Sequence, residues 1–167
     1  MVRADWEARV DLRTTRTIRS AIEIRAPLDT VWRILTDFSA YPEWNPHIRK
    51  VSGTPKVGGR ITINSRPPGG RAFVLRPVVI KWSPPTELRW RGTVVSRRLF
   101  SGEHGFRVEE LSAGRVRFRQ DETFTGLFVP LYARMRLRRT REGFSQVNEA
   151  LRARAESSAS TDEAQPS

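Results

Sequence analysis

Apolar and polar residues alternate along much of the chain, and the period of this alternation identifies the elements. In the segment 17–25, Ile18, Ile22 and Ile24 share one phase while charged residues occupy the other. Alternation with a period of two is typical of a half-buried β-strand. The sequence therefore predicts that the ordered part of the chain begins with a strand.

A helical pattern follows this strand. Pro27 suits the first turn of a helix, and the helix is expected to end before Tyr41-Pro42, because proline disfavours helical geometry in the preceding residue. Between these limits apolar residues recur at steps of three or four. They are Val31, Ile34, Leu35 and Phe38. A second short helix or tight loop, anchored by Tyr41 and Trp44, is expected next.

The segment from residue 47 to residue 125 predicts a series of strands. Glycine- and proline-containing turn signals divide it at regular intervals, and no helical pattern intervenes, which indicates an antiparallel sheet. The candidate strands are 47–53, 60–66, 72–82, 87–96, 99–110 and 115–125.

One long helix is predicted for residues 128–155, since apolar or small residues fall on one face. They are Ala133, Leu137, Thr140, Phe144, Val147 and Leu151. The chain thus divides into an N-terminal arm (1–16), one domain (17–156) and a disordered, polar tail (157–167).

Composition narrows the chemistry. The 167 residues are 38% hydrophobic and 29% charged, which suits one globular domain. There is no cysteine and there are only two histidines, so disulfides and thiolate sites are excluded and neither a metal nor a cofactor is expected. The N-terminus has no apolar run like that of a signal peptide, and no stretch approaches membrane-spanning length, so a cytoplasmic protein is expected.

Six stretches of the sequence carry a family resemblance. They are I-E-I-R-A-P-L-D-T-V-W-R-I-L-T-D-F (22–38), Y-P-E-W-N-P (41–46), E-L-R-W-R-G (87–92), F-S-G-E-H-G-F (100–106), R-F-R-Q-D-E-T-F-T-G-L (117–127) and R-E-G-F-S-Q-V-N-E-A-L-R-A-R-A-E (141–156). Together with the order of elements, they make residues 17–156 resemble the SRPBCC (START/birch-pollen-allergen-like) superfamily, in its polyketide cyclase/dehydrase and lipid transport branch.

The resemblance implies an α+β helix-grip fold. A curved antiparallel sheet of about seven strands would wrap around the long C-terminal helix, with two short helices after the first strand and an apolar cavity between sheet and helix. Tyr41 and Trp44 would stand near one end of that cavity. They can form a wall of a ligand pocket or plug the end of the core, because amphipathic rings serve either role.

Strand alternation predicts which side chains face inward. His104, Gln120 and Glu122 share the phase of apolar neighbours. A polar group on a buried face costs about 1–3 kcal/mol unless it is paired. These groups therefore either line the cavity and orient a ligand, or hydrogen-bond one another and complete the core. The full predicted lining is Phe38, Tyr41, Trp44, Leu88, Trp90, Phe100, His104, Phe106, Phe118, Gln120, Glu122, Ala133 and Leu137.

Three functions fit this picture. The first is binding or transfer of a hydrophobic or aromatic small molecule, lipid- or polyketide-like, without chemistry. The second is a cyclase or dehydratase in which His104 and Glu122 handle protons, the chemistry of the family's cyclases. The third is an adaptor that docks on lipid through the basic C-terminal helix.

The net charge of +12 bears on partners. Most arginines fall on faces away from the predicted core, so they either form a solvated surface or meet an anionic membrane. Phe128, Leu131 and Met135 lie about opposite Phe144 and Leu151 on the helix, so one group is expected to escape the main core. Nucleic acid is disfavoured because no binding motif is present, and the oligomeric state stays open.

Overall fold

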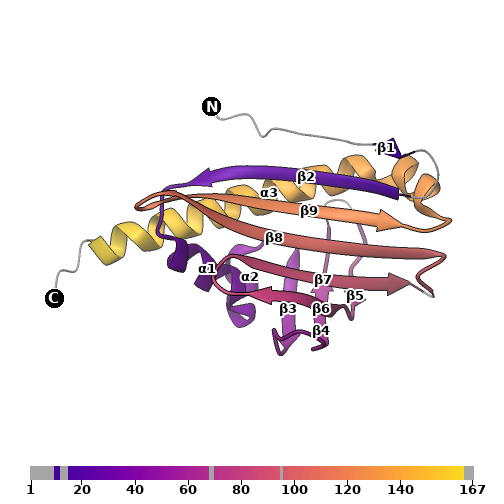
Figure 1. Cartoon of the computed structure of the whole chain (residues 1–167), viewed down its shortest axis with the longest axis horizontal. Helices are drawn as coiled ribbons and strands as arrows, with labels where there is room; N and C mark the ends of the chain where they lie inside the picture. Colours follow the sequence, from indigo (N-terminus) through magenta and orange to yellow (C-terminus); the bar gives the residue numbers. More distant parts are fainter. Residues whose placement is uncertain (1–9, 12–14, 68–69, 95, 164–167) are drawn as a thin grey trace.

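A large antiparallel sheet and one long helix dominate the computed structural model, which describes residues 10–11, 15–67, 70–94 and 96–163 (Figure 1). The sheet has six strands in the order β1-β2-β9-β8-β7-β6. These are β1 (Val10–Asp11), β2 (Thr15–Ile24), β6 (Val78–Ser83), β7 (Glu87–Val94), β8 (Phe100–Ser112) and β9 (Arg115–Thr125). The helices are α1 (Leu28–Thr36), the short 3-10 helix η1 (Phe38–Ala40), α2 (Tyr41–Trp44) and α3 (Val129–Glu163).

A second, three-stranded sheet stands beside the first. It consists of β3 (Ile48–Gly53), β4 (Ile61–Ser65) and β5 (Phe73–Leu75). The prediction of one sheet of about seven strands was therefore wrong in number and division, although the antiparallel sheet, the short helices and the long helix are confirmed. The predicted strand 72–82 splits because Pro77 has no N–H to donate to a strand ladder, and the chain passes there from β5 to β6.

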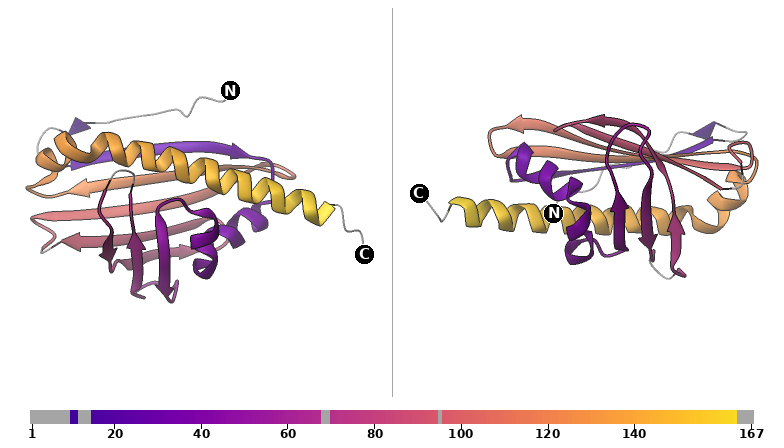
Figure 2. Two further views of the ribbon diagram at one scale, coloured as in Figure 1. Left: turned by 180° about the vertical axis from the view of Figure 1, so that it is seen from behind. Right: turned by 90° about the horizontal axis from the view of Figure 1, so that it is seen from below.

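The inner face of the six-stranded sheet is covered by α3, which crosses it diagonally (Figure 2). The strand phases are as predicted: Ile18, Ile22 and Ile24 are buried on β2, while Arg19 is exposed. On α3 the side chains of Phe144 and Leu151 are buried, and Phe128, Leu131 and Met135 are 50%, 58% and 62% exposed. The expectation that one apolar group leaves the core is confirmed, and it is the N-terminal group.

The ends of the domain differ from their predicted limits. Strand β2 begins at Thr15, and Val10–Asp11 pairs with it as β1, so part of the expected arm joins the sheet. Helix α3 continues through Glu163, into the expected tail. Ala155 is fully buried in the main core cluster and Ala159 packs against it, so this polar segment of the helix is held on the domain. Residues 1–9, 12–14 and 164–167 lie outside the described residues.

Candidate functional site

A cavity of about 760 Å³ lies between α3, the inner face of the six-stranded sheet, the three-stranded sheet and α2. This volume falls in the range of sites that enclose drug-sized ligands. Seven of the thirteen residues predicted as lining border it. They are Tyr41, Trp44, Trp90, His104, Phe106, Gln120 and Glu122.

Tyr41 and Trp44 close one end of this cavity. The Tyr41 hydroxyl donates to the Leu35 carbonyl at 2.8 Å, and the ring centroids of Tyr41 and Trp44 are 4.9 Å apart. Burial raises the pKa of the Tyr41 phenol, so it stays protonated. Both rings border the cavity and both are almost wholly buried. They therefore fill the two roles considered from the sequence, because they form a wall of the cavity and also close the end of the hydrophobic core.

A chain of polar side chains crosses from the sheet to α3 beside the cavity. Gln120 Nε2 donates to the Phe144 carbonyl at 3.0 Å and to Asn148 Oδ1 at 2.6 Å, and Asn148 Nδ2 donates to Ser20 Oγ at 3.2 Å. These bonds fix the Gln120 amide so that Oε1 points to His104 Nε2, 3.3 Å away. Since an amide oxygen only accepts, Nε2 carries the proton and Nδ1 is left as an acceptor.

The His104 ring is held between aromatic rings. Its centroid lies 4.4 Å from that of Phe106 and 5.0 Å from that of Phe144, and both pairs are stacked. Burial lowers the pKa of His104 to about 4 and the charge of Arg89 lowers it too, whereas the hydrogen bond that His104 donates to Gln120 acts in the opposite direction. The imidazole is therefore neutral at pH 7 and is a weak base.

Glu122 pairs with His104 across β8 and β9, and both side chains border the cavity. No hydrogen bond or ion pair joins the Glu122 carboxyl to another side chain of the described residues. Burial, together with the charge of Asp121, raises the pKa of Glu122 to about 8. At neutral pH the cavity thus contains an uncharged carboxylic acid that can donate a hydrogen bond, close to an imidazole that can accept one.

Six residues predicted as lining lie elsewhere. Leu88 and Phe118 are fully buried in the main core, and Phe38 packs there behind Tyr41. These side chains face inward as predicted, but α1, α3 and neighbouring strands cover them. The other three are Phe100, Ala133 and Leu137: Phe100 and Leu137 pack on a second core cluster, and Ala133 is half-buried outside the lining.

Much of the lining comes from residues that the sequence did not indicate. On α3 the cavity face includes Thr140, Phe144 and Val147 of the predicted face, and also four residues that the pattern did not indicate: Tyr132, Arg136, Arg139 and Gly143. The three-stranded sheet and its flanking loops contribute the rest. They are Asn45, His47, Ile48, Ile63, Ser65, Pro67, Gly70, Arg71, Ala72, Phe73 and Leu75.

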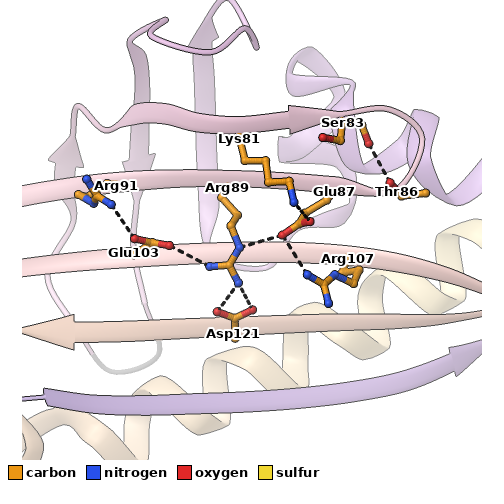
Figure 3. Close-up of polar contacts among 9 residues, drawn as sticks. All are labelled: Lys81, Ser83, Thr86, Glu87, Arg89, Arg91, Glu103, Arg107 and Asp121. Atoms are coloured by element: carbon orange, nitrogen blue, oxygen red, sulfur yellow. Dashed lines mark hydrogen bonds and ion pairs between the residues drawn. The ribbon is translucent and has the colours of Figure 1, made fainter.

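The outer face of the same strands carries a cluster of charges with Arg89 at its centre (Figure 3). The Arg89 guanidinium donates to Glu87 at 3.0 Å, to Glu103 at 3.0 Å and to both oxygens of Asp121 at 2.5 and 2.7 Å. Its place depends on Gly105, since a Cβ there would lie 2.5 Å from the guanidinium carbon. Lys81, Arg91 and Arg107 pair with the same acids, so the cluster contains four cations and three acids on the face of the sheet opposite the cavity.

Two further features of the described residues bear on function. They contain no group of three histidine, aspartate or glutamate side chains that could hold a metal ion. Their helices include none that is long and apolar enough to cross a membrane. The cytoplasmic location stays a prediction.

These features define a class: a helix-grip domain with a ligand-sized interior cavity. The chain belongs to the family described as polyketide cyclase / dehydrase and lipid transport, whose model matches residues 15–156. Membership supports either binding of a hydrophobic ligand or a cyclase-type function, and does not choose between them. Among curated proteins no match was found.

Solved structures share the fold at low identity. A START superfamily protein from Mycobacterium smegmatis is 20% identical over 84% of this chain and 97% of its own, with a TM-score of 0.68. The Zhui aromatase/cyclase from Streptomyces sp. R1128 is 16% identical over 85% of this chain and 94% of its own, with a TM-score of 0.71. Norcoclaurine synthase from Thalictrum flavum is 13% identical over 86% of this chain and 96% of its own, with a TM-score of 0.65. At these identities the likeness concerns the fold.

Proposed function

We propose that the protein binds and carries a largely apolar small molecule in the cavity. The observation that supports this most is the Glu122 carboxyl, which has no side-chain partner among the described residues and borders the cavity close to aromatic rings such as Trp90 and Phe106. A buried polar group without a partner is costly, and a ligand carbonyl or hydroxyl would satisfy it. The low pKa of His104 favours binding over chemistry, since its imidazole is a weak base at neutral pH.

Native mass spectrometry of the freshly purified protein tests the proposal. We expect an adduct that is released on denaturation. Val147→Trp places a large ring in the cavity from α3 and should abolish the adduct, whereas Val57→Trp, at a surface position that is 63% exposed, should not. An adduct that is equally abundant in both variants would show that the cavity is not the binding site.

A cyclase or dehydratase is the second candidate, favoured by one observation. Glu122 is a carboxylic acid that is protonated at neutral pH, and its cross-strand partner His104 has a free acceptor at Nδ1. An acid and a base side by side suit an aldol-type cyclisation or a dehydration. Turnover of a polyketide-like substrate that vanishes in His104→Ala while ligand affinity survives would establish the enzyme. Absent turnover with a tightly bound lipid would favour the carrier.

Docking on an anionic lipid surface is the third candidate. Leu127, Phe128, Leu131 and Met135 form an exposed apolar patch at the start of α3. Exposed arginines surround it, among them Arg98, whose carbonyl accepts a hydrogen bond from the Leu127 N–H. Apolar side chains ringed by cations suit an anionic membrane surface.

Vesicle co-sedimentation tests the docking. Vesicles that contain phosphatidylserine should retain the protein at low salt and release it at high salt, and Leu131→Asp should weaken the retention. Phosphatidylcholine vesicles serve as the uncharged control. Lack of retention at low salt would exclude this docking.

A further inference from the structure

The charged residues of the cavity lining are unevenly distributed. Among the described residues of the lining the only acid is Glu122, whereas three arginines border the cavity: Arg71, Arg136 and Arg139. All three arginines are exposed, and so is Phe73 beside them at 43%, which identifies this side as the mouth. The opposite side is closed by residues that are at most 6% exposed. They are Trp90, Phe106, Gln120 and Phe144.

Tyr132 connects the two sides. Its side chain borders the cavity together with Glu122 and Arg136. Burial raises the pKa of the Tyr132 phenol to about 12, and of the two charged neighbours Glu122 raises it further while Arg136 lowers it. The hydroxyl itself is engaged with Thr140 Oγ1 at 2.8 Å. The cavity therefore passes from a neutral hydrogen-bonding end at Glu122 and His104 to a cationic end at Arg136.

Two of the cations at the mouth, Arg71 and Arg136, have no acidic partner among the described residues. A guanidinium binds carboxylates and phosphates through paired, charge-assisted hydrogen bonds, and partial removal from water strengthens them. At the deep end a ligand anion would find the uncharged Glu122 and aromatic rings, with no cation in the lining to offset its desolvation.

We propose that the ligand is an amphiphilic organic anion, whose carboxylate or phosphate lies at the mouth on Arg71 and Arg136 and whose neutral carbonyl or hydroxyl reaches Glu122 and His104. The proposal rests on the cavity being the ligand site, as proposed above. It adds a ligand class and an orientation, since the anionic group stays at the entrance while the apolar body fills the interior.

A matched set of ligands tests the proposal by isothermal titration of the full chain, below the concentrations at which the ligands form micelles. Hexadecanoate and hexadecyl phosphate carry the anion, and methyl hexadecanoate has the same body without charge. We expect both anions to bind about tenfold to a hundredfold more tightly than the ester at low salt, with the ratio falling as salt rises.

Variants locate the effect. Arg136→Met and Arg71→Met should each reduce the preference for the anions severalfold and leave the affinity of the ester unchanged. Arg134→Met is the matched control, because Arg134 is exposed on the same helix and does not border the cavity; it should change neither.

The outcomes separate the two proposals. Equal affinity for hexadecanoate and its ester would overturn the anionic ligand class and leave the carrier function standing. A preference that responds to Arg134→Met as strongly as to Arg136→Met would overturn the assignment of the mouth. If none of the three ligands binds, the cavity is not a carrier site for such molecules and the proposed function itself fails.

Discussion

Replacing Glu122 by glutamine should make the protein more stable, and increasingly so as the pH rises. The amide has nearly the shape of the acid and can donate the same kind of hydrogen bond, but it cannot ionise. The Glu122 carboxyl is buried and has no cation beside it, so the folded protein resists its ionisation. The substitution therefore removes the free-energy cost of keeping this carboxyl protonated in the folded protein, and it leaves the packing unchanged.

The size of the effect follows from the pKa of this one group. Below its ordinary value of 4.5 the carboxyl is protonated in both the folded and the unfolded chain, and it contributes nothing to the pH dependence. As the pH rises past that value, only the unfolded chain ionises, so the free energy of unfolding falls until the pH reaches about 8. At about 1.4 kcal/mol per pKa unit, the complete loss is on the order of 5 kcal/mol.

Urea denaturation of the original protein and of Glu122→Gln between about pH 5 and pH 9 measures this directly. The difference in unfolding free energy should grow by about 1.4 kcal/mol per pH unit and level off near pH 8. His104, Tyr132 and Asp121 are the titratable groups near the carboxyl and are present in both proteins, so their own titrations largely cancel. A difference that stays constant over this range would show that Glu122 is ionised normally in the folded state.

Three further predictions concern stability. In the original protein the free energy of unfolding should fall by about 3 kcal/mol as the pH decreases from about 6.5 to 4, because the folded protein resists protonation of the His104 ring. His104→Gln should remove this loss, and urea denaturation across that pH range checks it. Arg89→Met should cost about 1–3 kcal/mol by urea denaturation, since its side chain is 21% exposed and its acidic partners lose their cation. Arg138 is the control, since its side chain is 92% exposed, and Arg138→Met should cost under about 0.5 kcal/mol. Equal costs for Arg89→Met and Arg138→Met would contradict a stabilising role of the charge cluster. Leu151→Ala should cost about 2–5 kcal/mol in thermal or urea unfolding, against under about 0.5 kcal/mol for Met135→Ala, because Leu151 is fully buried and Met135 is 62% exposed.

The order of the elements along the chain and the facing of side chains could be predicted because local patterns decide them. In β8 and β9 a one-residue slip would turn His104, Gln120 and Glu122 outward and expose Phe106 and Phe118, so the register is tightly specified. The division into two sheets could not be found in the same way. The apolar character of residues 72–82 runs through Pro77, and which sheet each half joins depends on contacts with distant strands.

The cavity face of α3 was found only in part. Thr140, Phe144 and Val147 belong to the predicted face and border the cavity, whereas its other members were missed for a related reason. Apolar periodicity identifies the residues that pack against other protein atoms, and by that measure Ala133 and Leu137 looked inward. A helix face beside an empty volume is under no such requirement, so Tyr132, Arg136 and Arg139 border the cavity with the composition of a surface. Apolar periodicity therefore predicts the residues of the hydrophobic core, but it does not identify the residues that line the entrance of the cavity.

The two faces of β8 and β9 show how a neutral cavity can lie within a strongly charged protein. The outer residues Glu103 and Asp121 meet Arg89 on one side of the sheet, and the inner residues His104 and Glu122 follow them directly in the sequence on the other side. Arg89 disfavours a proton on His104, and Asp121 disfavours an anion at Glu122, so each outer charge helps to keep an inner group uncharged. Because Gly105 leaves room for the Arg89 guanidinium against the sheet, the charge stays close enough to act through it. The alternation of side chains thus places outer charges next to inner groups. The protonation states of His104 and Glu122 therefore depend in part on Arg89 and Asp121, which a ligand in the cavity would not contact.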